Sequence, residues 1–232
     1  MIETERELLN EMEKHIVKVL KTEFIIHNVK RFIVEKPAGY KFVPGQATDV
    51  SINKPGLEDE LRPFTFTGTN DQDHLEFTIK IYKSHNGVTA KLLDVNEGDE
   101  LIIHDVWGAI HYKGPGLFLA GGAGITPFLA IFREQLRHGD LSGSKLFFAN
   151  RSEKDVFLHN ELKGMFGENY IDILSEPTPP LEPAFVEMKM LKEEVLKGTN
   201  RFYVCGPDQF IEIMVENLMS LGVRQSNIVI ES

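Results

Sequence analysis

The two halves of the chain differ in the pattern of their apolar and polar residues. From residue 15 onward, short runs rich in Val, Ile, Phe and Thr are separated by turns that contain Gly, Pro and Asn. These runs predict strands over 16–20, 22–29, 47–52, 64–68, 75–81 and 100–105. Six short strands with such turns indicate an antiparallel β-barrel.

After Lys113, strand-like runs alternate with amphipathic helical runs. Strands are expected over 117–120, 146–149, 170–174, 202–205 and 228–230, and helices over 127–138, 156–166, 188–196 and 209–221. This alternation predicts a doubly wound α/β domain whose parallel sheet is covered on both faces. We therefore expect two domains, 15–112 and 113–232. The Glu-rich residues 1–14 fit a short helix or a solvated tail.

Composition narrows the class of protein. The chain has 232 residues, of which 42% are hydrophobic and 26% charged, as in ordinary globular proteins. A net charge of −10 argues against a general binder of nucleic acid or anionic membranes. The single cysteine, Cys205, excludes an internal disulfide and any metal or iron–sulfur site made of cysteines alone. Neither a signal peptide nor a membrane-spanning run of ~20 apolar residues is evident, and the eight histidines show no ligand spacing, so we expect a cytoplasmic protein without a metal.

Four residues at the start of a predicted strand are candidates for ligand binding. Arg62, Pro63, Phe64 and Thr65 follow a turn. An Arg can hold a phosphate with two hydrogen bonds, and Phe64 projects from the same strand face two residues later. Taken alone, this segment also fits a surface Arg beside a core Phe.

Two segments place glycine where a strand leads into a helix. In 121–127, the sequence GGAGITP allows close backbone approach, and Thr126 is expected to cap the following helix with Pro127 in its first turn. Such a helix start favours a pyrophosphate, although the usual G-x-G-x-x-G fingerprint is absent. Cys205, Gly206 and Pro207 form the second turn, where Cys205 alone fits a buried structural residue equally well.

The order and spacing of these motifs resemble the ferredoxin/flavodoxin–NADP reductase superfamily over nearly the whole chain, in particular its flavodoxin reductase and cytochrome b5 reductase-like members. The resemblance implies an FAD-binding barrel over 15–112, an NAD(P)-binding domain over 113–232 and a flavin in the cleft between them. It favours FAD over FMN. Phe64 replaces the tyrosine of the family motif, which retains stacking and loses a hydroxyl.

The same resemblance implies the site residues. Flavin contacts are expected from Arg62, Pro63, Phe64, Thr65, Thr78, Ile79, Lys80, Gly87, Val88 and Thr89. Nicotinamide nucleotide contacts are expected from Gly121, Gly122, Ala123, Gly124, Thr126, Cys205, Gly206 and Pro207. Three residues are candidate catalytic groups: Thr65 at the flavin N5 edge, Cys205 where the nicotinamide C4 meets N5, and Glu231 near N5. By itself, Lys80 also fits an exposed strand residue, and Gly87, Val88 and Thr89 fit a plain helix start.

Nucleotide choice depends on Arg151, Ser175 and Glu176. Family members that prefer NADPH often carry a Ser-Arg pair after the third strand, and here Ser175 is followed by Glu176. A glutamate suits a free ribose hydroxyl, whereas Arg151 can hold a 2′-phosphate. We expect NADPH as the donor, with NADH open.

The expected activity is electron transfer from NAD(P)H through FAD to a soluble carrier, flavodoxin or ferredoxin. Two alternatives are an electron-transfer subunit of a larger complex and a nucleotide-sensing module without catalysis. Intact motifs in both halves argue against a sensor, which needs one nucleotide.

Overall fold

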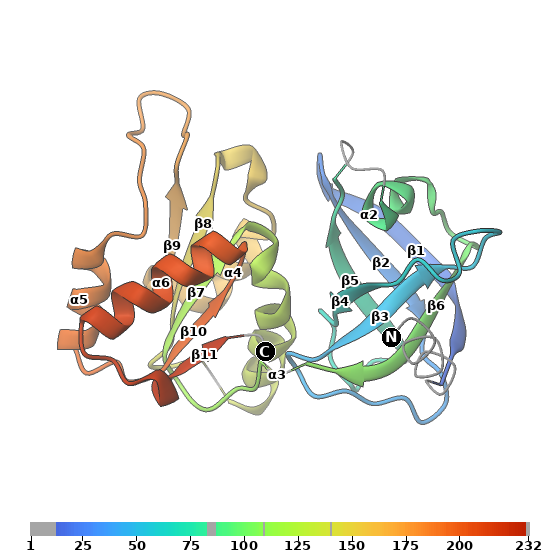
Figure 1. Ribbon diagram of the computed structural model, residues 1–232, viewed down its shortest axis with the longest axis horizontal. Helices are drawn as coiled ribbons and strands as arrows, with labels where there is room; N and C mark the ends of the chain where they lie inside the picture. The colour runs from blue at the N-terminus through green and yellow to red at the C-terminus, as the bar shows by residue number, and fades with distance from the viewer. Residues whose placement is uncertain (1–12, 83–86, 109, 140, 231–232) are drawn as a thin grey trace, which may run out of the picture.

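The computed structural model describes residues 13–82, 87–108, 110–139 and 141–230, which form two domains side by side (Figure 1). The first contains β1 His15–Ile26, β2 Val29–Glu35, β3 Ala47–Ile52, β4 Arg62–Thr65, β5 His74–Lys80, α2 Val88–Lys91, η1 Leu92–Asp94 and β6 Glu100–Trp107. The second contains β7 Leu117–Gly121, η2 Gly122–Ile125, α3 Thr126–His138, β8 Lys145–Asn150, η3 Glu153–Asp155, α4 His159–Phe166, η4 Gly167–Asn169, β9 Tyr170–Leu174, α5 Met188–Leu196, β10 Phe202–Cys205, α6 Asp208–Ser220, η5 Gln225–Asn227 and β11 Ile228–Ile230. Of the predicted helix or tail at 1–14, residues 1–12 lie outside this description.

The first domain is a closed antiparallel barrel with strand order β4-β3-β6-β1-β2-β5. A bridge between Phe66 and Phe77 joins the two edge strands and closes it. Both rings are fully buried, and their centroids are 5.1 Å apart. Closure leaves little unpaired strand edge, and the aromatic rings fill the interior.

The boundaries of the six barrel strands differ from the predicted ones. The expected strands 16–20 and 22–29 are largely one strand, β1, which continues through a register shift between Val19 and Lys21. Strand β2 was not predicted, because Lys30 and Arg31 interrupt its apolar pattern. Lys30 is nevertheless 3% exposed. Its ammonium donates to the carbonyl oxygens of Leu92, Leu93 and Val95 at 3.3, 3.0 and 2.6 Å, which supports the short helical segment α2–η1.

The second domain is a five-stranded parallel sheet with order β11-β10-β7-β8-β9, which confirms the predicted α/β class. Helices α3 and α4 contribute to the apolar cluster on one face, and α5 and α6 to the cluster on the other. The strand order reverses direction between β7 and β10. In open α/β sheets, ligands bind beyond the carboxyl ends of the strands at such a switch point.

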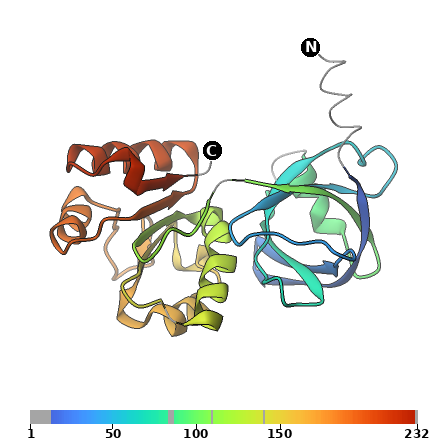
Figure 2. The ribbon, with the colours of Figure 1, turned by 90° about the horizontal axis from the view of Figure 1, so that it is seen from below.

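Helix α3 lies at the boundary between the two domains (Figure 2). The apolar cluster around Phe128 and Phe132 includes Val29 of the barrel, and Ile25 and Ile26 pack against it. The barrel therefore rests on the same helix that begins at the switch point of the sheet.

Candidate functional site

A cavity of about 450 Å³ lies at the switch point and is lined by both domains. The barrel contributes Ala47, Pro63, Phe64, Thr65, Thr78, Ile79, Lys80, Tyr82 and Thr89. The α/β domain contributes Gly121, Gly122, Ala123, Gly124, Thr126, Pro127, Cys205, Gly206 and Pro207. Residues predicted from separate motifs thus meet around one space.

The cavity is bridged by a hydrogen bond between the domains. The Thr65 hydroxyl at the end of β4 donates to the Thr126 hydroxyl oxygen at the start of α3, over 2.9 Å. The prediction that Thr126 caps α3 is wrong. The N-cap position is occupied by Ile125, whose side chain has no polar atom to cap the helix. Thr126 is already the first helical residue, so its hydroxyl is available to the barrel. Pro127 lies in the first turn, as expected.

Glycine allows the two strand-to-helix turns to touch. Strands β7 and β10 are neighbours, with Ala120 opposite Cys205. A Cβ atom on Gly124 would lie 2.3 Å from the Cys205 carbonyl oxygen, and one on Gly206 would lie 3.1 Å from the Gly121 Cα. Side chains at these positions would force the turns apart. Cys205, 6% exposed, is held beside the glycine turn by this packing.

Gly122 has a different role from its neighbours. Its φ of +52° is in the left-handed region that favours glycine, and a Cβ there would meet only the Lys80 ammonium, at 3.9 Å. The backbone at Gly122 is therefore bare toward the cavity and close to a cation. This combination fits the approach of a phosphate-bearing cofactor.

A second cavity, of about 480 Å³, adjoins the first and shares Lys80, Gly121, Gly122 and Pro207 with it. Its wall includes the apolar side chains of Phe185, Val186, Phe210, Ile213 and Met214, none of which was predicted as a site residue. Arg151 and Ser175, which were predicted, line its polar side. The Arg151 Nε donates to the Glu176 carboxylate over 2.7 Å, and this bond together with the Glu176 charge raises the pKa of Arg151.

Several predicted residues lie away from the cavity linings. Arg62 is exposed, and its guanidinium donates to the Leu61 carbonyl oxygen over 2.6 Å. Val88 is 1% exposed within the barrel core, and Gly87 is the N-cap of α2. The predicted catalytic residue Glu231 lies outside the described residues.

Tyr82 was missed by the sequence reasoning although it lines the first cavity. Burial raises the pKa of its phenol. The Lys80 ammonium lies 5.9 Å from the centre of its ring. Its position two residues after Lys80, just beyond the end of β5, is the signal that could have identified it.

The cavity residues suit a flavin dinucleotide and a nicotinamide dinucleotide. The first cavity offers four threonine hydroxyls, one ammonium, an aromatic ring at Phe64 and the bare backbone of Gly122. The second offers an apolar wall next to Arg151 and Ser175. Within the described residues, no group of three or more His, Cys, Asp or Glu side chains is arranged to hold a metal ion.

Comparison with known protein families agrees with the cofactors that these cavity residues suit. An oxidoreductase FAD-binding domain matches residues 16–112, and an oxidoreductase NAD-binding domain matches residues 118–216. The chain belongs to the ferredoxin–NADP reductase-like superfamily, which confirms the resemblance seen in its motifs. The expected cofactor pair, FAD with a nicotinamide dinucleotide, is confirmed with it.

Curated relatives include two kinds of reductase. The reductase component of propane 2-monooxygenase from Rhodococcus jostii is 30% identical over 211 residues, which cover 83% of this chain and 56% of the relative. NADH-cytochrome b5 reductase 1 from Aspergillus terreus is 29% identical over 246 residues, which cover 95% of this chain and 82% of the relative. The chain thus spans little more than half the length of the Rhodococcus protein.

Solved structures share the two-domain fold. A ferredoxin NADP⁺ reductase from Neisseria gonorrhoeae, with bound FAD and NADP, has a TM-score of 0.79 at 16% identity over 95% of this chain and 98% of that one. A cytochrome P450 reductase from Amycolatopsis has a TM-score of 0.81 at 20% identity over 95% of this chain and 70% of that one. Among the described residues of this chain, no helix is both long and apolar enough to span a bilayer.

Proposed function

We propose that this protein is an NAD(P)H-dependent FAD oxidoreductase that passes electrons to a carrier protein. The observation that carries the proposal is the first cavity, where Thr65 and Thr126 join the two domains and Cys205 lies in the same lining. A sensing module needs one nucleotide site, whereas this chain has two adjoining cavities, one lined by both domains and the other mainly by the α/β domain.

Each cavity supports a different part of the reaction. Phe64 offers a ring for stacking on the flavin, and Thr65, Thr78 and Thr89 offer hydroxyls. Cys205 orients the nicotinamide beside the Gly121–Gly124 turn. When bound, FAD supplies the chemistry by accepting a hydride and releasing electrons singly or in pairs.

The donor we propose is NADPH, recognised at Arg151 and Ser175 of the second cavity. Arg151 keeps guanidinium donors beyond the Nε that faces Glu176, whereas Glu176 itself would repel a phosphate. Arg151→Ala should raise KM for NADPH and leave KM for NADH nearly unchanged, and Glu176→Gln should lower KM for NADPH. Equal KM changes for NADPH and NADH would show that these residues do not recognise the 2′-phosphate.

The acceptor we propose is a soluble one-electron carrier, flavodoxin or ferredoxin. A second candidate is the oxygenase or its partner ferredoxin in a multicomponent system. It is favoured by the Rhodococcus relative and by a 22% identical relative from Pseudomonas putida, the ferredoxin–NAD(P)⁺ reductase component of a naphthalene 1,2-dioxygenase system. These 232 residues contain one cysteine and so cannot by themselves hold a cysteine-ligated iron–sulfur cluster.

The deciding experiment is a visible spectrum of the purified protein, followed by anaerobic addition of NADPH and, in parallel, NADH. Flavin bands that bleach would support the proposal, and the faster nucleotide would identify the donor. Flavodoxin, ferredoxin and cytochrome b5 would then be offered in turn as acceptors. A protein that stays colourless after FAD is supplied would refute the proposal.

A further inference from the structure

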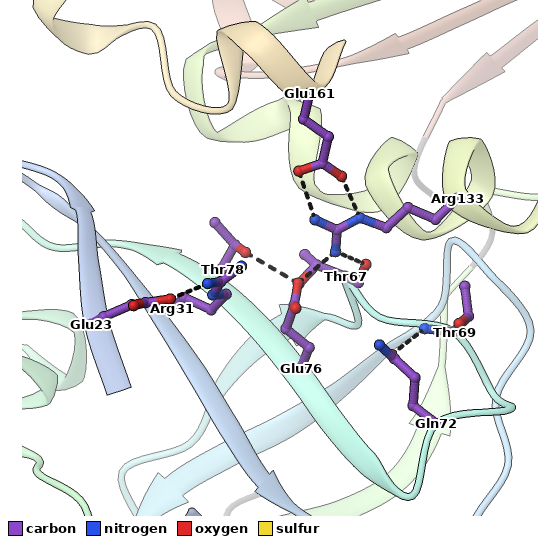
Figure 3. A network of polar contacts seen from close by, with 9 residues as sticks. All are labelled: Glu23, Arg31, Thr67, Thr69, Gln72, Glu76, Thr78, Arg133 and Glu161. Atoms are coloured by element: carbon purple, nitrogen blue, oxygen red, sulfur yellow. Dashed lines mark hydrogen bonds and ion pairs between the residues drawn. The ribbon is translucent and has the colours of Figure 1, made fainter. Parts of the chain in front are cut away.

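A polar network, largely buried, connects α3 to the barrel (Figure 3). Arg133 lies two turns after Thr126, about 10 Å along the helix axis, and its side chain is 18% exposed. Its guanidinium donates from Nε and Nη2 to the Glu161 carboxylate of α4, at 2.7 and 3.1 Å. From Nη1 it donates across the domain boundary to the Glu76 carboxylate at 2.5 Å and to the Thr67 carbonyl oxygen at 2.6 Å.

The barrel side of this network continues to the cavity wall. The side chain of Glu76 is 7% exposed, and its Oε1 also accepts a hydrogen bond from the Thr67 hydroxyl at 2.7 Å. The Thr67 hydroxyl lies 3.2 Å from that of Thr78, which lines the first cavity. A continuous series of contacts therefore leads from α3 through Glu76 and Thr67 to Thr78.

A second arginine on α3 provides an internal comparison. Arg137, one turn beyond Arg133, pairs with Asp71 in the segment between β4 and β5. Arg137 and Asp71 are 43% and 48% exposed, so solvent and salt screen this pair. Both arginines hold the same barrel segment, but only Arg133 does so where water is largely excluded.

We propose that Arg133 is a positioning residue that holds the NAD-binding domain against the barrel in the orientation the reaction needs. The proposal rests on the proposed flavin-dependent function. The planar guanidinium serves two carboxylates and a carbonyl at fixed angles, which a lysine ammonium cannot reproduce. Because α3 also carries Thr126, a rotation of α3 on the barrel would move one cavity wall relative to the other.

Four variants separate positioning from simple stabilisation. Arg133→Met removes the guanidinium and keeps the apolar part of the side chain. Arg133→Lys keeps the positive charge and removes the planar group with its fixed set of N–H donors. Arg133→Met combined with Glu76→Gln removes both buried charges, because an unpaired Glu76 can itself impair folding. Arg137→Met is the matched control, with the same substitution on the same helix against the same barrel segment.

Two measurements are made on each variant. The first is amide hydrogen exchange of the 67–76 segment and of α3, without nucleotide. The second is the anaerobic rate of flavin reduction, with the KM for the nucleotide. We expect the Arg133→Met, Arg133→Lys and double variants to lose protection at the boundary and to reduce flavin about tenfold to a hundredfold more slowly. KM should change less than about threefold, and Arg137→Met should resemble the wild type in both measurements.

Two results would overturn the proposal. One is a double variant that reduces flavin as fast as the wild type, which would leave Arg133 a stabilising role alone. The other is equal protection at the boundary in Arg133→Met and Arg137→Met. If the wild-type protein is reduced by neither nucleotide, the proposed function fails, and hydrogen exchange alone decides whether Arg133 holds the domains together.

Discussion

Replacement of Gly124 by alanine tests the contact between the two glycine turns. The added methyl would lie 2.3 Å from the Cys205 carbonyl oxygen, 2.4 Å from its carbonyl carbon and 2.5 Å from the Gly206 nitrogen. All three atoms belong to the backbone, so no side chain can rotate away. Overpacking of this kind costs about 1–3 kcal/mol, and the backbone neighbours place this site toward the upper value.

The expected loss of stability is measurable by thermal unfolding. At about 2–4 °C per kcal/mol for a chain of this size, Gly124→Ala should lower the midpoint by up to about 12 °C. Relief of the clash also separates Cys205 from the first turn, and a displacement of about 1 Å can slow a reaction a hundredfold. The rate of anaerobic flavin reduction should therefore fall as well.

Gly164 provides the control for this substitution. It lies in α4, and a Cβ there would meet nothing within 4 Å. Gly164→Ala should leave the reduction rate unchanged and stabilise the protein by about 0.5–1 kcal/mol. A Gly124→Ala protein with the midpoint and reduction rate of the wild type would refute the backbone contact between the turns.

Three further predictions concern single side chains. Cys205→Ala should slow anaerobic flavin reduction while bound flavin stays near the wild-type amount, and an unchanged rate would contradict its orienting role. Lys30→Met should destabilise the barrel by about 2–4 kcal/mol, because buried carbonyl oxygens lose their donor; equal denaturant midpoints would exclude this. Burial, with the charge of Lys14, lowers the pKa of His104. Folding therefore favours the neutral imidazole. The free energy of unfolding should keep its full value above about pH 6.5 and decrease below that pH, by at most about 1.4 kcal/mol per pH unit. His104→Gln should flatten the decline in urea titrations, and identical pH dependence would exclude the assignment.

Local steric requirements made much of the site predictable from the sequence. Glycines 121, 122 and 124 mark a turn that only small residues allow, and both strand-to-helix turns lie where the alternation of elements placed them. The glycine turns depend on residues close together in the chain. Thr65, Thr78 and Lys80, which also line the cavity, were expected from the family resemblance and not from a local pattern.

Features that depend on distant residues were missed. Strand β2 was hidden because Lys30 and Arg31 look exposed, and the carbonyl groups that hold Lys30 lie far along the chain. Arg133 appears in the sequence as one more charged residue of an amphipathic helix, since its partner Glu161 lies on another helix and its partner Glu76 lies in the other domain. The predicted capping of α3 by Thr126 was wrong, and the hydrogen bond that its hydroxyl makes instead could not be foreseen, because the partner Thr65 belongs to the other domain.

The position of β10 in the sheet sets the order in which the site can form during synthesis. Strand β10 pairs with β7, although two strands, β8 and β9, and three α-helices, α3, α4 and α5, are made between them. The barrel and the first glycine turn leave the ribosome well before Cys205, Gly206 and Pro207, which form the remaining wall of the cavity. Because domains generally fold in the order of their synthesis, we expect the barrel to be complete while the proposed nicotinamide site is still unfinished. The proposed flavin side of the cavity would then form before the side that receives the nicotinamide.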